Sequence, residues 1–196
     1  MLRVGITGGI GSGKSVVCRI FNSLGIPVYN ADDAAKNIMQ QDENVKQELK
    51  TLLGNIYDDD GTLNRKKVAA HIFNNNQLLA AINSIVHPAV VADSVQWEQK
   101  VTTHYFIRES AILFESGTNN RLDKIILVEA PEELRIQRII QRDQRTREQI
   151  QLIINQQWST EKKKKLSDYT IINDDHHALF PQVLNLHQIF TALANA

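Results

Sequence analysis

The sequence predicts an α/β protein of the three-layer type, with a mainly parallel sheet covered by helices on both faces. Short apolar runs of strand length alternate with helical periodicity along the chain, and a glycine-rich turn joins the first strand to the first helix. The 196 residues are 42% hydrophobic and contain only 9 glycines and 4 prolines, so they can fill a core. We expect one domain with inserted helices.

The first elements form a β-α-β unit. Residues 2–7 are a short branched run that ends in a glycine cluster, which predicts a buried strand. Apolar residues recur with a 3.6-residue period through 16–24 and stop at Gly25, which predicts a helix with a glycine cap. The apolar piece 26–29 predicts the second strand.

The middle of the chain carries little strand signal and predicts a helical insertion, in which one apolar helical face runs up to His87-Pro88. Short apolar runs at 105–107, 125–128 and 169–172 predict the remaining strands, and a helix closes the chain. We therefore expect one domain built from three parts: a core at about 1–30, 104–131 and 168–196, a helical insertion at about 32–100, and a helical lid at about 132–166.

The charge composition limits the partners. Lys plus Arg and Asp plus Glu number 22 each, so no net field attracts nucleic acid or an anionic membrane. We find no signal peptide and no apolar run near the roughly 18 residues of a membrane span, and the single cysteine, Cys18, predicts a buried thiol in a reducing compartment. These features predict a soluble cytoplasmic protein; they leave its oligomeric state open.

The strongest motif is Gly8-Gly9-Ile10-Gly11-Ser12-Gly13-Lys14-Ser15, which matches G-x-x-x-x-G-K-[ST] between a predicted strand and a predicted helix. Backbone N–H groups of such a loop surround phosphate oxygens, the lysine neutralises the β- and γ-phosphates, and the serine hydroxyl binds Mg²⁺. The motif predicts an ATP site of the P-loop NTPase type, formed by Gly9, Gly11, Ser12, Gly13, Lys14, Ser15 and Val16. The alternatives are a glycine turn that only packs a helix on a strand, and a dinucleotide fold, whose glycine spacing is missing.

Carboxylates follow two predicted strands at the sheet edge where ligands of α/β proteins collect. We expect Asp32 to be the general base for an acceptor hydroxyl, with Asp33 beside it at the acceptor. The alternative is that both only begin the next helix. Glu109 is the candidate to hold Mg²⁺ through water. Glu115 is a second candidate carboxylate, but it could equally be a residue of a surface helix.

A basic segment runs from Arg135 to Lys165 and holds nine basic and three acidic residues, a net +6 that leaves −6 for the rest of the chain. Arginines of such a lid stabilise the charge on a transferred phosphate. We expect Arg138 and Arg142, one helical turn apart, to act on ATP, with Arg142 catalytic. For Lys162 to Lys165 a solvated helix is the favoured interpretation.

Together these residues resemble the dephospho-coenzyme A kinase family. Its pattern is matched in order and approximate spacing from residue 2 to about 175 by the loop, Ala31-Asp32, Gly61-x-Leu63-x-Arg65 leading to Phe73, His87-Pro88, Leu113-Phe114-Glu115, Arg138-x-x-x-Arg142-Asp143, Gln157, Lys163 and Asp168-Tyr169-x-Ile171-x-Asn173. The resemblance implies transfer of the ATP γ-phosphate to the ribose 3′-hydroxyl of dephospho-coenzyme A, with Asn173 near the adenine and Arg65 and His87 near the acceptor.

The chain departs from the family pattern at several positions. Asn30 and Glu109 stand where aspartate is usual, Ala111 where proline is usual, and Ile153 where an arginine is usual, so that Arg138, Arg142, Arg145 or Arg147 would have to compensate. Two other functions remain: another P-loop kinase for a nucleoside, nucleotide or shikimate-like acceptor, and a nucleotide-dependent switch or binding module.

Overall fold

Five parallel strands make the sheet of the larger of two compact units. They are β1 (Leu2–Thr7), β2 (Val28–Asn30), β3 (Tyr105–Glu109), β4 (Lys124–Glu129) and β5 (Tyr169–Ile172), in the spatial order β2-β3-β1-β4-β5. The computed structural model describes residues 1–72 and 75–195, and only the backbone of residues 65 and 76. The larger unit comprises residues 1–30 and 101–196, and the smaller unit residues 31–100.

The strand register brings three strand ends together at one edge of the sheet. Glu109, the last residue of β3, is the register partner of Ile6 in β1 and of Asn30 in β2. Since all strands are parallel, the segments that follow β1, β2 and β3 all begin at this edge of the sheet.

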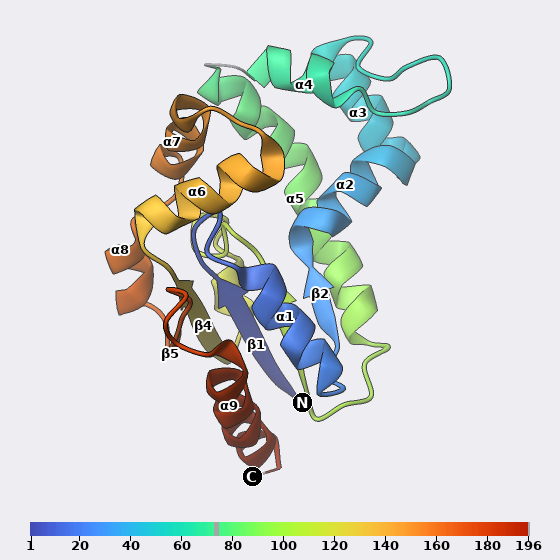
Figure 1. The fold of residues 1–196 in the computed structure, drawn as a ribbon. Helices are drawn as coiled ribbons and strands as arrows, with labels where there is room; N and C mark the ends of the chain where they lie inside the picture. The colour runs from blue at the N-terminus through green and yellow to red at the C-terminus, as the bar shows by residue number, and fades with distance from the viewer. Residues whose placement is uncertain (73–74, 196) are drawn as a thin grey trace. The chain divides into compact units, whose positions relative to one another are not determined.

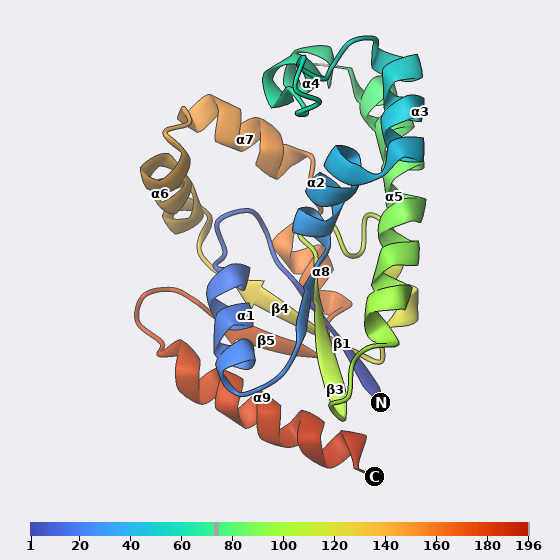
Figure 2. The same cartoon turned by 90° about the vertical axis from the view of Figure 1, so that its right-hand side faces the viewer.

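Helices cover both faces of this sheet, as predicted (Figures 1 and 2). On one face, α1 (Lys14–Ser23) and α9 (Leu179–Ala194) share a core with β1, β3, β4 and β5. Alternate residues of β4 divide between the faces: Ile126 and Val128 join this core, whereas Ile125 packs with Leu113 and Phe114. The short helix η1 (Thr118–Arg121) ends the loop that carries Leu113 and Phe114, and α8 (Thr160–Lys165) contacts β4.

The region from 132 to 166 is broken into separate helices rather than one long one. They are α6 (Glu132–Asp143), α7 (Arg147–Asn155) and α8. Gln144 ends α6 in a left-handed conformation, Thr146 and Gln149 form a reciprocal capping box that starts α7, and the Ser159 side chain caps α8. These polar residues end one helix and begin the next within the region 132–166, which the sequence analysis treats as a single helical lid.

The smaller unit is helical, with its own core. It holds α2 (Ala31–Gln41), α3 (Glu43–Leu53), α4 (Arg65–Ile72) and α5 (Asn76–Glu98) around residues such as Leu49, Ile56 and Val86. Helix α5 continues through Pro88 instead of ending there. By length and composition alone its segment Gln77–Glu98 could span a membrane, contrary to the expectation that no apolar run is long enough. Part of its apolar surface, including Ile82 and Val86, packs in this core.

The cysteine behaves as the sequence predicted. Cys18 is buried in the core of the larger unit, on α1. Burial, reinforced by the nearby Glu109 carboxylate, raises the pKa of its thiol to about 12. The thiol is therefore protonated at neutral pH and acts as a small apolar side chain.

Helix α9 offers a matched test of this packing. Phe190 is fully buried with its ring against Tyr105 and Tyr169, whereas Phe180 on the same helix is 53% exposed. Phe190→Ala should lower the free energy of unfolding by about 3–5 kcal/mol, because it leaves a cavity, and Phe180→Ala by well under 1 kcal/mol. Denaturant unfolding measures both; equal losses would contradict the packing described.

Candidate active site

The glycine-rich loop passes from the end of β1 into the first turn of α1. Gly13, at φ 89°, caps α1 without a side chain, and its carbonyl accepts from the N–H groups of Val16 and Val17. A Cβ at position 13 would overlap the amide of Asn173, so glycine is required both by conformation and by space. The N-terminus of α1, which no side chain caps among the described residues, presents its positive dipole end to an anion.

Lys14 lies buried inside the loop. Its ammonium donates to the carbonyl of Gly8 at 2.9 Å and to that of Gly9 at 3.5 Å, and lies 3.8 Å from Glu109 Oε1. Glu109 is itself buried at the strand edge described above. A cation and an anion thus stand side by side where the loop would hold phosphate, which is the charge pair that a nucleotide–metal complex needs.

Oxygen groups around the loop suit a magnesium ion. Glu109 supplies a carboxylate beside Lys14, and the exposed Ser15 supplies a hydroxyl at the start of α1. The buried hydroxyls of Thr7 and Ser12 have no hydrogen-bond partner among the described residues. No cluster of three or more His, Cys, Asp or Glu side chains suited to a metal occurs in that part of the chain.

Asn173, directly after β5, ties the far side of the loop to α6. Its amide donates to the Ser12 carbonyl at 2.7 Å, and its oxygen accepts from Arg138 at 3.3 Å. Arg138 also pairs with Asp175, while its Nη1 is buried without a partner among the described residues. The structure therefore brings Asn173 and Arg138 together at the loop, as the two predicted nucleotide-binding residues require.

Arg142 does not join them. Its guanidinium is exposed and forms two hydrogen bonds with the neighbouring Asp143, at 2.7 and 2.9 Å. This pairing raises the pKa of Arg142 and lowers that of Asp143. Arg138 and Arg142, though one turn apart, thus engage different partners, and no contact of Arg142 with the loop occurs among the described residues.

The residues expected at the acceptor belong to the smaller unit. Asp32 and Asp33 are exposed in the first turn of α2, and Asp33 pairs with Lys36 at 2.6 Å. His87 is half-buried in α5, and burial lowers the pKa of its imidazole. Arg65 begins α4, but its side chain lies outside the described part of the chain, as does all of Phe73.

The structure corrects the prediction for Lys163 and excludes the surface alternative left open for Glu115. Lys163 belongs to a run predicted to be solvated, yet it is 1% exposed and bonds to the Ala111 carbonyl at 2.7 Å and to Glu115 at 2.8 Å. Glu115 also accepts from the Trp158 N–H, so it is a largely buried anchor, 14% exposed, and not a solvated surface residue. Four consecutive lysines cannot share one helix face, and that geometry could have signalled that one of them turns inward.

Gln157 and Arg135 also contact the loop. Gln157 accepts from the Ile10 N–H at 2.9 Å, and the Arg135 guanidinium lies so close to Gly9 that a Cβ there would overlap it. The sequence places Arg135 in the basic segment but indicates no role for it. Arg135 lies four residues before Ile139, so both are on one helix face. This spacing with an apolar residue is the sequence signal that Arg135 turns inward.

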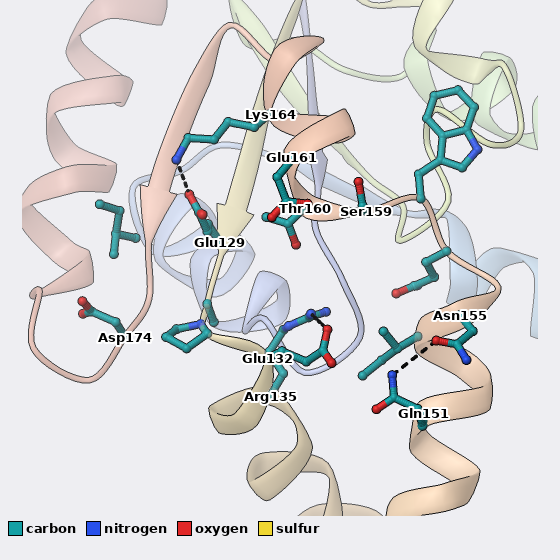
Figure 3. A pocket seen from close by; sticks show the side chains of 16 residues that line it. Glu129, Glu132, Arg135, Gln151, Asn155, Ser159, Thr160, Glu161, Lys164 and Asp174 are labelled. Carbon is teal, nitrogen blue, oxygen red and sulfur yellow. Dashed lines mark hydrogen bonds and ion pairs between the residues drawn. The ribbon is translucent and has the colours of Figure 1, made fainter.

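A pocket of about 730 Å³ lies next to the loop, between the ends of β4 and β5 and helices α6, α7 and α8 (Figure 3). Its lining mixes carboxylates and cations, with Lys164 paired to Glu129 and Arg135 to Glu132. Residues 8–15 do not line it. The loop, not this pocket, therefore defines the nucleotide site, and Arg135 stands between the two.

Comparison with known proteins decides the family. Residues 2–178 match the family model described as dephospho-CoA kinase. The chain belongs to the dephospho-CoA kinase family. A dephospho-CoA kinase of Porphyromonas gingivalis (strain ATCC BAA-308 / W83) is 42% identical over 95% of this chain and 93% of its own length. The resemblance inferred from the motifs is thus confirmed.

Solved structures agree with the fold. A crystal structure from Thermus thermophilus, 30% identical, superposes with a TM-score of 0.84 and covers 97% of this chain and 96% of that one. A dephospho-CoA kinase from Campylobacter jejuni, 27% identical, gives a TM-score of 0.72 with 97% of each chain covered. The predicted P-loop kinase fold is therefore confirmed, and family membership removes the switch and other-acceptor alternatives.

The buried pair of Lys163 and Glu115 generates a stability prediction. Lys163→Met leaves Glu115 as an uncompensated buried charge and should lower the free energy of unfolding by about 3–5 kcal/mol. The control is Lys165→Met, because Lys165 is exposed on the same short helix. Thermal unfolding of both variants measures the difference; matching transitions would show that the pair carries no stability.

Proposed function

We propose that this chain transfers the γ-phosphate of ATP to the ribose 3′-hydroxyl of dephospho-coenzyme A, giving coenzyme A and ADP, as a soluble cytoplasmic enzyme. The observation that carries the proposal is the pairing of buried Lys14 with buried Glu109 at the mouth of the glycine-rich loop, in a chain of this family. Small-molecule phosphoryl transfer relies on positioning and charge neutralisation, which this arrangement supplies.

Residues of the loop have separate roles in that reaction. Lys14 leaves the Gly8 and Gly9 carbonyls to neutralise the β- and γ-phosphates, while the N–H groups of Gly11, Gly13, Lys14 and Ser15 hold their oxygens. Asn173 and Arg138 orient the nucleotide from the side of β5. Mg²⁺, held through Ser15 and water-linked Glu109, would neutralise the developing charge on the phosphates.

Asp32 is proposed as the base that orients and deprotonates the acceptor hydroxyl. Its position in the chain supports this role. Asp32 lies two residues after Asn30, the last residue of β2, and Asn30 is the register partner of Glu109. Asp33, Arg65 and His87 are proposed acceptor-binding residues. Arg142 is proposed as a catalytic lid arginine that exchanges Asp143 for phosphate.

One assay tests the function directly. The purified chain is given ATP and Mg²⁺ with dephospho-coenzyme A, AMP, shikimate or no acceptor, and ADP release is measured. We expect ADP only with dephospho-coenzyme A, a product carrying one added phosphate by mass spectrometry, and loss of turnover when EDTA removes the metal. ADP release without an acceptor, or preference for another acceptor, would refute the proposal.

The base assignment has its own test. Asp32→Asn should lower kcat by about 10²–10⁴-fold, the usual contribution of a general base, and leave the Kd for ATP nearly unchanged. Asp33→Asn should mainly raise the KM for dephospho-coenzyme A. Steady-state kinetics of both variants separate the roles, and a kcat loss confined to Asp33→Asn would move the base to Asp33.

A further inference from the structure

Arg135 is a buried cation in contact with the phosphate loop. It lies in the first turn of α6, its side chain is only 7% exposed, and its Cζ would lie 3.1 Å from a Cβ at Gly9. From within the loop, Lys14 donates to the carbonyl of the same Gly9. Two positive side chains thus contact Gly9. Among the described residues, no other position of the loop has two such contacts.

The charge of Arg135 is poorly compensated. Among the described residues its only ion pair is with Glu132, through Nη2 at 3.3 Å (Figure 3), and that carboxylate is 53% exposed. Glu161 attracts it electrostatically without forming an ion pair. Its Nε is buried without a hydrogen-bond partner. Burial also lowers the pKa of the guanidinium. Since an arginine carries five N–H donors, a buried guanidinium with one long contact lowers the stability of the fold.

The surrounding packing keeps Arg135 at this place. Ile10 of the loop packs into the cluster of Ile136, Ile139 and Ile150, which joins α6 to α7. A Cβ at Gly11 would lie 2.6 Å from the Arg135 carbonyl, so loop and helix backbones are in direct contact. The loop and the start of α6 therefore form one packed body, and the guanidinium needs no lid movement to reach Gly9.

We propose that Arg135 is a positioning residue for the ATP phosphates, which acts through Gly9 by holding the loop backbone and adding positive charge beside it, with Glu132 as the competing anion. The proposal rests on ATP being the phosphoryl donor. A buried cation with few partners gains more interaction free energy on binding an anion than a fully paired one, because the phosphate oxygens accept hydrogen bonds that water can no longer accept. Arg135 thus lowers the stability of the free protein and raises its affinity for nucleotide.

Four variants test this inference: Arg135→Met, Arg135→Lys, Glu132→Gln and, as a control, Arg19→Met, which removes an exposed arginine of α1. Isothermal titration with AMP-PNP and Mg²⁺ measures affinity, and thermal unfolding without nucleotide measures stability. Arg135→Met should bind AMP-PNP about 10- to 100-fold more weakly, the range that charge-assisted contacts contribute, yet melt no lower than the parent. Arg135→Lys should recover part of the affinity, and Glu132→Gln should bind more tightly than the parent.

A structural role would give the opposite pattern. If the Arg135–Glu132 ion pair only stabilises the fold, both Arg135→Met and Glu132→Gln should melt at a lower temperature than the parent. Their AMP-PNP affinities should then be unchanged or reduced equally. Either affinity result overturns the proposal. In turnover assays Arg135→Met should raise the KM for ATP with kcat changed less. A parent chain that binds AMP-PNP through Arg135 but fails to phosphorylate dephospho-coenzyme A would refute the proposed function and leave this inference standing.

Discussion

The buried ammonium of Lys14 is the interaction on which the rest of the larger unit depends. A buried cation has to be surrounded by acceptors, and here these are two carbonyls of the loop and the carboxylate of Glu109. The loop has to curl so that the carbonyls of Gly8 and Gly9 face the ammonium. β3 has to end level with β1 so that Glu109 reaches the ammonium. One buried charge thus constrains both the shape of the loop and the register of β3 against β1.

Segments distant in sequence complete this arrangement. The loop is tied by the Asn173 amide at Ser12, by the Gln157 oxygen at Ile10, and by the contact of Arg135 with Gly9. The motif's own hydrogen bonds, such as those of Lys14 with the Gly8 and Gly9 carbonyls, are supplemented by side chains that come from α6, from Gln157 in the turn between α7 and α8, and from Asn173 after β5. Phosphate binding is therefore a property of the whole unit.

Local patterns predicted the sheet, the phosphate loop and the helical insertion, since strand runs, glycine spacing and apolar periodicity each act over a few residues. The boundaries and the inward charges could not be predicted in the same way. Whether Lys163 faces water or Glu115 depends on which helix face meets β4, and whether Arg142 meets phosphate or Asp143 depends on where α6 ends. The placing of Asp32 and His87 relative to the loop depends on two separate units.

The hydrogen bond between Asn173 and the Ser12 carbonyl spans 161 positions of the chain. During synthesis the glycine-rich loop leaves the ribosome long before Asn173 is made, and the strands β4 and β5 that complete the sheet also come late. A nascent chain therefore carries the complete motif without the support that shapes it. Ligand stabilisation that acts through the shaped loop therefore becomes available only after β5 and Asn173 have been made.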